Sequence, residues 1–287
     1  MEKEPLRIAI QKSGRLRDGS MKLLHEAGIR LPNGQEQLRV QTTNFPLEIL
    51  FLRNSDIPNY VRDGIVDVAI VGENLLVEKG EGLQTVLKLG FSRCHLALAV
   101  PRAVDYPGLS WWQGKKIATS YPNSLRKFLK KNNIEAQIHE ISGSVEIAPN
   151  IGLADGICDL VSTGSTLFQN RLKEVEKLLD SEAVLAMGET LPEGKMRILD
   201  DLIFRLKAVL AAETNKYILL NAPNNKLDDI KKIIPGMKSP TILPLAERGW
   251  SSVHSVISED DFWQVIDKLK ANGAQGILII PIEKMVL

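Results

Sequence analysis

The segment DGIVDVAIVGENL (residues 63–75) aligns without gaps on DGICDLVSTGSTL (residues 155–167). Both copies begin with Asp-Gly-Ile-x-Asp, continue through an apolar run of strand length, and place a glycine and a leucine at equal distances from the start. A helix end followed by a strand and a βα turn tends to look like this in any α/β protein, which is the general explanation. The functional explanation is a pair of similar α/β lobes with a cleft between them.

Short β-branched runs alternate with helical patterns on both sides of the repeat. Residues 6–11, 47–52 and 116–119 read as strands, whereas residues 20–27 and 125–132 read as helices. Such alternation is typical of an α/β fold with largely parallel sheets.

The last third of the chain has a different pattern, which follows a predicted helix over residues 196–212. Two β-α-β units in about 70 residues predict a ferredoxin-like βαββαβ domain, with a boundary near Ala212–Asn215. The second helix has the clearest start, because Ser258 and Asp261 form a pattern like a capping box. The expected elements are strands at 216–223, 241–245, 252–257 and 276–282 and helices at 225–235 and 258–272.

Composition excludes several classes of protein. With 44% hydrophobic and 25% charged residues, the chain has the average mixture of a soluble globular protein. Its 36 Lys and Arg balance 35 Asp and Glu, so bulk charge indicates neither a nucleic-acid partner nor a membrane surface. The apolar runs reach only strand length and the N-terminus does not resemble a signal peptide, so we expect a cytoplasmic protein. Cys94 and Cys158 indicate neither a disulfide framework nor a thiolate metal site.

The second copy of the repeat is a candidate phosphate site. Its strand ends in hydroxyl residues around Gly164, at the carboxyl edge where open α/β sheets bind ligands. Hydroxyls and successive backbone N–H groups can surround a phosphate, although a plain capped turn has the same composition. Asp155 and Asp159 could bind ribose hydroxyls or a metal-chelated diphosphate, or could equally cap a helix end and a strand end.

A basic turn after the first strand is a second candidate. Lys12, Gly14 and Arg15 could bind a polyphosphate, and Arg53 follows another strand that could end at the same cleft. The spacing of a P-loop is absent, and an exposed basic turn is the alternative interpretation. The four histidines are scattered, so the sequence predicts no hydrolytic or metal constellation.

Eight motifs together resemble one known family, ATP phosphoribosyltransferase in its long form, from Leu6 to Ile282. They are specific in this order and spacing rather than singly. The motifs are IQKSGRL (10–16), SDIP (55–58), GEN (72–74), ATSYP (118–122), GSVEIAP (143–149), GLAD (152–155), DLVSTGSTL (159–167) and PTILPL (240–245).

This resemblance implies a two-lobed catalytic part like a type II periplasmic binding protein over residues 1–212. Lobe I would span about 1–99 and 181–212, lobe II about 100–180, and a regulatory histidine-binding domain would span 213–287. The implied reaction is the first step of histidine biosynthesis: phosphoribosyl pyrophosphate and N1 of ATP give phosphoribosyl-ATP and pyrophosphate, with Mg²⁺. Feedback inhibition by L-histidine and a homo-oligomer, from dimer to hexamer, are also implied. The alternative is a non-catalytic two-lobed solute-binding or anion-binding protein.

The resemblance also implies roles for individual residues. Lys12, Arg15 and Glu146 would be catalytic, and no residue is assigned to Mg²⁺. Some relatives carry an acidic group at the position of Asn221, which bears on how the histidine ammonium is recognised. Phosphoribosyl pyrophosphate would contact Asp155, Asp159, Ser162, Thr163, Gly164, Ser165 and Thr166; ATP would contact Lys12, Gly14, Arg15, Arg53 and Glu73; histidine would contact Asn221, Thr241 and Ala274.

Overall fold

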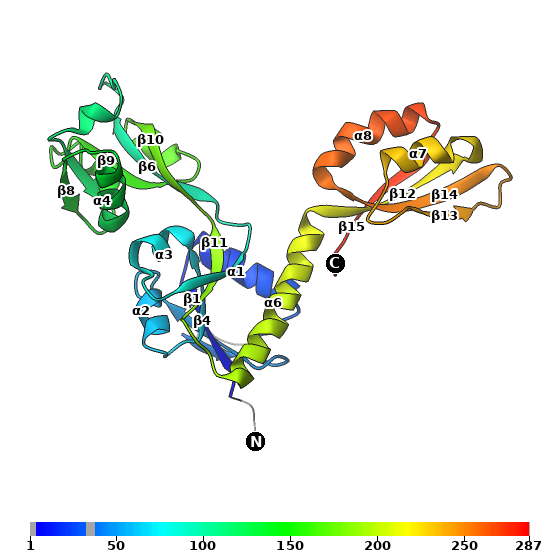
Figure 1. Cartoon of the computed structure of the whole chain (residues 1–287), viewed down its shortest axis with the longest axis horizontal. Helices are drawn as coiled ribbons and strands as arrows, with labels where there is room; N and C mark the ends of the chain where they lie inside the picture. The colour runs from blue at the N-terminus through cyan, green and yellow to red at the C-terminus, as the bar shows by residue number, and fades with distance from the viewer. Residues whose placement is uncertain (1–3, 33–37, 287) are drawn as a thin grey trace. The chain divides into compact units, whose positions relative to one another are not determined.

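The computed structural model describes residues 4–32 and 38–286 (Figure 1). Two compact units are present, Met1–Lys22 with Ile29–Leu199 and Leu23–Gly28 with Asp200–Leu287. Among the described residues, no helix is long and apolar enough to cross a membrane. Helix α6 (Glu193–Glu213) carries the chain from the first unit into the second.

The first unit contains two sheets, and the first of these defines lobe I. β1 pairs in parallel with both β3 and β4, while β11 adds antiparallel to β4. Helices α1 (Arg15–Glu26), α2 (Ile57–Arg62) and α3 (Glu73–Lys79) follow β1, β3 and β4 along the chain. The strand order is β2 (Arg39–Gln41), β3 (Leu47–Leu52), β1 (Leu6–Gln11), β4 (Val68–Gly72), β11 (Ala183–Met187) and β5 (Gln84–Lys88).

The second sheet defines lobe II. β9 pairs in parallel with β7 and antiparallel with β6. Helices α4 (Pro122–Lys131) and α5 (Ser165–Gln169) and short 3₁₀ turns at Leu109–Trp112 and Val145–Ile147 complete this lobe. The strand order is β10 (Leu172–Ser181), β6 (Cys94–Pro101), β9 (Gly156–Val161), β7 (Lys116–Thr119) and β8 (Gln137–Glu140).

The chain crosses between the lobes twice, and the two crossings are hydrogen-bonded to each other. Leu89 donates its backbone N–H to Ala183 O at 2.9 Å, and Ala183 N donates to Phe91 O at 2.9 Å. β6 begins at Cys94, so the second sheet starts a few residues before the limit of about 99 expected from the sequence.

The repeat occupies equivalent places in the two lobes. β4 and β9 each lie between one parallel strand and one antiparallel strand, and the antiparallel strand is the one that the chain enters from the other lobe. Helices α3 and α5 begin at the aligned positions Glu73 and Ser165. The strand starts do not align. Asp67 accepts the Arg7 backbone N–H at 2.7 Å, whereas its counterpart for Lys116 is Asp155, at 2.8 Å. Residues 68–72 separate Asp67 from the start of α3, whereas residues 156–164 separate Asp155 from the start of α5. The aspartate at the start of the strand is therefore four residues farther from its helix in the second copy.

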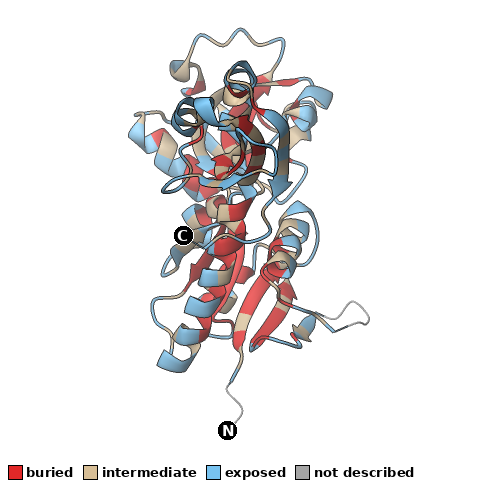
Figure 2. Cartoon of the chain, turned by 90° about the vertical axis from the view of Figure 1, so that its right-hand side faces the viewer, coloured by how far each residue is buried: buried red, intermediate tan, exposed pale blue. Residues whose placement is uncertain are grey.

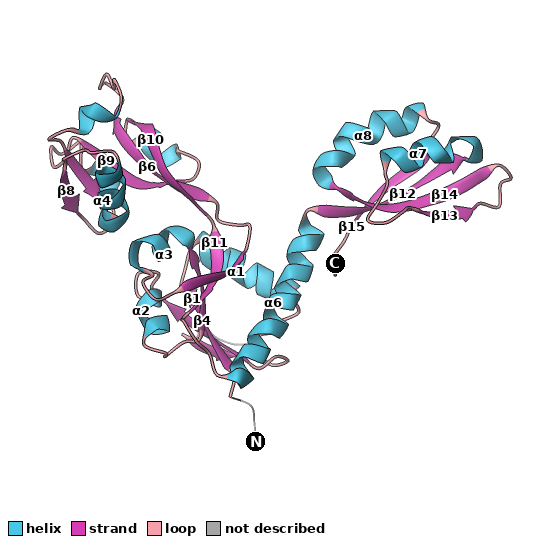
Figure 3. Cartoon of the chain, viewed as in Figure 1, coloured by secondary structure: helices cyan, strands magenta, loops and turns pink. Residues whose placement is uncertain are grey.

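The C-terminal unit has the predicted βαββαβ order, with all neighbouring strands antiparallel. Ser258 Oγ accepts the Asp261 N–H at 3.0 Å and begins α8 as the sequence predicted. Before α7, residues 224–226 form a 3₁₀ turn, so this helix is shorter than expected. The strand order is β13 (Thr241–Pro244), β14 (Trp250–Ser258), β12 (Asn215–Pro223) and β15 (Gln275–Pro281), with α7 (Leu227–Ile233) and α8 (Glu259–Ala271) as the helices (Figure 3).

Apolar side chains of the strands form the cores of all three sheets (Figure 2). Lobe I buries residues such as Ile57 and Val71, and lobe II buries Trp112 completely. In the C-terminal unit, Ile218, Ile230 and Leu269 belong to one cluster. The predicted α/β architecture with a separate βαββαβ domain is confirmed, and strand β10 is an element that the sequence patterns did not indicate.

Candidate active site

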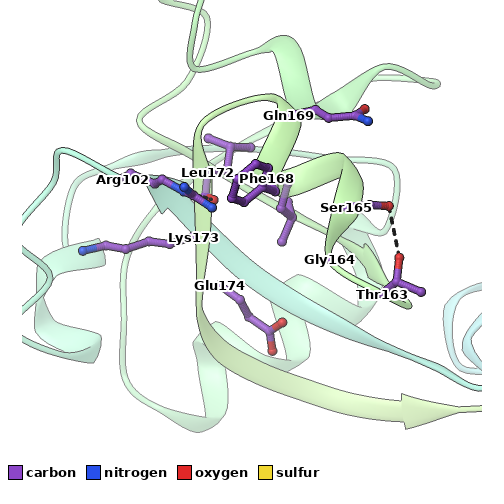
Figure 4. Close-up of a pocket in the computed structure, with 10 residues that line it drawn as sticks. Arg102, Thr163, Gly164, Ser165, Phe168, Gln169, Leu172, Lys173 and Glu174 are labelled. Carbon is purple, nitrogen blue, oxygen red and sulfur yellow. Dashed lines mark hydrogen bonds between the residues drawn. The ribbon is translucent and has the colours of Figure 1, made fainter.

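The hydroxyl-rich loop joins the end of β9 to α5. Gly164 has φ +73°, a left-handed conformation that glycine adopts without strain. Gly164 is the N-cap residue of α5, and no side chain there accepts a hydrogen bond from the first N–H groups of the helix. The Thr163 and Ser165 hydroxyls lie 3.0 Å apart (Figure 4). Ser162, Thr163, Ser165 and Thr166 are all exposed. The loop thus presents hydroxyls and free backbone donors together, which suits a phosphate group.

The basic turn of lobe I meets this loop of lobe II. The Arg15 guanidinium donates from Nη1 to Ser162 Oγ at 3.2 Å. Gly14 has φ +89° and reverses the chain before α1, so that Arg15 is the first residue of the helix. Gln11 pairs with Leu52, so Lys12 and Arg53 are the next residues of adjacent parallel strands. Three exposed cations therefore gather where the carboxyl ends of these strands face the loop.

Asp159, in the strand that leads to the loop, has a second acidic side chain, Glu146, near it. Burial raises the pKa of Asp159 from 3.8 to about 6; the hydrogen bond from the Leu160 backbone N–H, at 2.8 Å, opposes this rise, and the nearby Glu146 carboxylate adds to it. Glu146 lies in the 3₁₀ turn Val145–Ile147. Burial also raises the pKa of Tyr121, with the negative charge of Asp159 as a smaller cause. A carboxyl group whose pKa is raised by burial and by a neighbouring carboxylate, on the strand that leads to a phosphate loop, is typical of a functional site.

Two of the predicted contacts lie away from the phosphate loop. Asp155 accepts the Lys116 N–H at the amino end of β9, and the six residues of that strand, about 20 Å in length, separate it from the loop. The structure therefore does not bring Asp155 to the phosphate loop. Glu73 lies at the crossing between the lobes, where its carboxylate pairs with Lys88 at 3.2 Å.

A pocket of about 520 Å³ lies against the loop (Figure 4). The sequence did not indicate this pocket. The guanidinium carbon of Arg102 lies 4.2 Å from the centre of the exposed Phe168 ring on one wall. Phe168 directly follows the DLVSTGSTL motif, which was the only signal that pointed toward it. Another cavity of about 590 Å³ is bordered by both lobes, including Ser55, Glu78 and Tyr121.

The described part of the chain holds no group of three or more His, Cys, Asp or Glu side chains that could bind a metal ion. A dedicated protein cage for a divalent cation is therefore absent from these residues. Mg²⁺ commonly binds through one or two carboxylates together with substrate phosphates, and the Glu146–Asp159 pair fits that mode.

Of the three residues expected to contact histidine, Asn221 and Thr241 lie on strands of the C-terminal sheet and Ala274 lies just before one. Asn221 of β12 pairs with Gln275, the first residue of β15, which places it beside Ala274, the residue before that strand. Thr241 lies on β13, at the opposite edge of the sheet. Three strand spacings, about 14 Å, separate the two edges. Thr241 thus lies two strands away from Asn221 and at the opposite edge from β15.

Comparison with known proteins adds to this geometry. The family model described as ATP phosphoribosyltransferase matches residues 53–208, and the model of the C-terminal domain of HisG matches residues 212–284. Proteins named ATP phosphoribosyltransferase from Phocaeicola vulgatus and Azobacteroides pseudotrichonymphae are 55% and 58% identical over 282 residues, 98% of this chain and 100% of each relative. The ATP phosphoribosyl transferase (HisG:HisZ) complex from Thermotoga maritima contains a chain with a TM-score of 0.63 and 25% identity; the match covers 72% of this chain and 98% of that one.

Proposed function

The chain belongs to the ATP phosphoribosyltransferase family, and from that premise we propose how its cleft carries out the reaction. The enzyme catalyses the first step of histidine biosynthesis, in which the phosphoribosyl group of phosphoribosyl pyrophosphate is transferred to ATP. We further propose residues 1–212 as the catalytic part and residues 213–287 as the regulatory part. The matched ranges, which end at 208 and resume at 212, support that division.

The 5-phosphate of phosphoribosyl pyrophosphate binds the loop of residues 162–166 in this proposal. The observation that carries it is the left-handed Gly164 with exposed hydroxyls on both sides and no side-chain cap on α5. Each N–H or hydroxyl donated to a charged phosphate contributes about 1.5–3 kcal/mol. In lobe I the aligned turn carries Glu73 instead, and a carboxylate would repel phosphate, so only the second copy suits this role.

The cations of lobe I bind the remaining phosphates. Lys12, Gly14, Arg15 and Arg53 are the proposed ATP-side and pyrophosphate-side contacts, with Glu73 at the border of this region. The hydrogen bond between Arg15 and Ser162 supports a site shared by both lobes, because the same guanidinium reaches the loop that holds the second substrate. Arginine suits this position since its planar fork can donate two hydrogen bonds to one phosphate.

The proposed chemistry is displacement of pyrophosphate from the anomeric carbon by N1 of adenine, through an oxocarbenium-like transition state. Glu146 and Asp159 face the ribose side, where their negative charge would stabilise the developing positive charge. Glu146 and Asp159, together with substrate phosphates, would hold Mg²⁺, which would supply positive charge for the pyrophosphate leaving group. Arg15 and Lys12 add positive charge on the same side, so positioning and electrostatics account for the rate.

Feedback inhibition by L-histidine is proposed for the C-terminal domain. Asn221 and Ala274 lie side by side, while Thr241 lies at the far edge, so we propose that one copy supplies the first two and another copy supplies the third. This arrangement requires a homo-oligomer, within the range from dimer to hexamer. Because both substrates are nucleotide-pool metabolites, we place the reaction in the cytoplasm.

Incubation of the protein with ATP, phosphoribosyl pyrophosphate and Mg²⁺ tests the activity. We expect phosphoribosyl-ATP and pyrophosphate in equal amounts, and we expect no product when either substrate is omitted. Binding of both substrates without turnover would contradict the assignment as an enzyme.

A further inference from the structure

A buried carboxylate of lobe I caps a helix of lobe II. Glu78, in the last turn of α3, is only 5% exposed. Its Oε1 accepts the Asn123 backbone N–H at 2.8 Å, and its Oε2 accepts both the backbone N–H and the hydroxyl of Ser124, at 2.8 and 2.7 Å. Both carboxylate oxygens are thus bound to the first turn of α4.

Helix α4 has no cap of its own. Its N-cap residue Tyr121 makes no side-chain hydrogen bond to the helix, and Pro122 has no N–H to donate. The first free N–H groups of a helix need acceptors, and a negative charge at this end is favoured by the helix dipole. Glu78 meets both requirements from the other lobe, 45 residues earlier in the chain.

The contact is reciprocal. Asn123 Nδ2 donates to Glu78 O at 3.0 Å, and Lys127 Nζ donates to Val77 O at 3.4 Å. Carbonyl groups in the last turn of α3 therefore receive donors from α4. Each helix satisfies the unpaired backbone groups of the other, which specifies their relative position more closely than apolar contact does.

The first turn of α3 is fixed at the crossing between the lobes. Ser181 Oγ accepts the Asn74 N–H at 2.9 Å and donates to Asn74 Oδ1 at 2.9 Å. Helix α3 is thus held at one end by the returning crossing strand and at the other end by α4. Two fixed points leave little freedom for lobe II to turn against lobe I.

We propose that Glu78 is a positioning residue, which holds the two lobes so that Arg15 of lobe I faces the phosphate loop of lobe II. The inference rests on the proposed function, because it concerns substrates shared between these two elements. Glu78 itself is not assigned any contact with substrate. Its loss would misalign the ATP-side cations with bound phosphoribosyl pyrophosphate while the loop itself stayed intact.

Glu78→Gln tests the proposal in the full-length enzyme. The glutamine side chain has one acceptor oxygen instead of two, so it cannot accept from the Asn123 and Ser124 backbone N–H groups with separate oxygens as glutamate does. We therefore expect kcat to fall about tenfold. Binding of ribose 5-phosphate, a probe of the lobe II loop alone, should stay within about twofold of wild type. Glu81→Gln, the same change at an exposed position just after α3, should leave both values unchanged.

Ser124→Ala is the second variant, which removes one of the hydrogen bonds to the same carboxylate and should lower kcat about threefold with unchanged ribose 5-phosphate binding. An unchanged kcat in folded Glu78→Gln overturns the proposal; if that variant does not fold, an unchanged kcat in Ser124→Ala does so. A matching loss of ribose 5-phosphate affinity also overturns it, because Glu78 would then support only the fold of lobe II. Turnover by the wild-type enzyme tests the proposed function separately.

Discussion

Replacement of Asp159 by asparagine is expected to stabilise the protein at alkaline pH and to impair its activity. The carboxyl group is held among buried side chains, which raises its pKa from 3.8 to about 6. Since a tenfold change in a dissociation constant corresponds to about 1.4 kcal/mol, this rise corresponds to about 3 kcal/mol. The raised pKa means that protonated Asp159 favours the folded state. Its contribution is complete below about pH 4 and is lost as the pH rises through 6.

At pH 8 the wild-type protein therefore carries a half-buried carboxylate that destabilises the fold. Asparagine has nearly the same shape and can still accept the Leu160 N–H through its amide oxygen, but it does not ionise. The upper limit of the gain is about 3 kcal/mol, and we expect about 1–2 kcal/mol because the surroundings relax around a charge. At pH 5 the gain should be about half as large.

Urea unfolding at pH 8 and pH 5 measures this difference, and Trp111 and Trp112 provide a fluorescence signal from the same lobe. Asp63→Asn, at an exposed aspartate of the repeat, is the matched control and should change the free energy of unfolding at neither pH. Steady-state kinetics of Asp159→Asn should show kcat/KM for phosphoribosyl pyrophosphate reduced about 10- to 100-fold. A variant that is less stable than wild type at pH 8, or equally shifted at both pH values, would refute this account of the strained carboxylate.

Two further substitutions test the loop and the regulatory sheet. Gly164→Ala should lower the free energy of unfolding by about 1 kcal/mol, because a residue with a Cβ is strained at φ +73° even though no atom lies within 4 Å of that Cβ. Gly194→Ala is the control, because Gly194 has equal space and no positive φ. It should be neutral or slightly stabilising in the same denaturation assay. Asn221→Asp should strengthen inhibition by histidine several-fold, since a carboxylate at this position pairs with the ammonium group; inhibition curves that overlay those of wild type would remove Asn221 from the histidine site.

The phosphate loop could be located from the sequence because its signals are local. A strand end, a glycine and four hydroxyls stand within six residues, and the structure places them as expected around a left-handed Gly164. The role of Asp155 could not be read in the same way. The alignment without gaps pairs Asp155 with Asp63, whereas in the structure Asp155 takes the place of Asp67, at the start of the strand and away from the loop.

Strand β10 was missed for a physical reason. Residues 172–181 are rich in Leu, Lys and Glu, which favour helices, and register shifts after Glu174 and after Lys177 interrupt the alternation of a regular strand. Its pairing with β6, from Leu172 with Pro101 to Ser181 with Cys94, determines the conformation instead. The cap provided by Glu78 is non-local in the same sense, because nothing near Glu78 in the sequence specifies that α4 lacks an acceptor.

The central claim, that the loop of residues 162–166 holds the 5-phosphate of phosphoribosyl pyrophosphate, is tested most directly by calorimetric titration of Thr166→Ala with each substrate in the presence of Mg²⁺. Loss of one donor to a charged phosphate predicts an affinity for phosphoribosyl pyrophosphate reduced about 10- to 100-fold, with the affinity for ATP nearly unchanged. Equal losses for the two substrates, or a larger loss for ATP, would contradict the assignment of the loop.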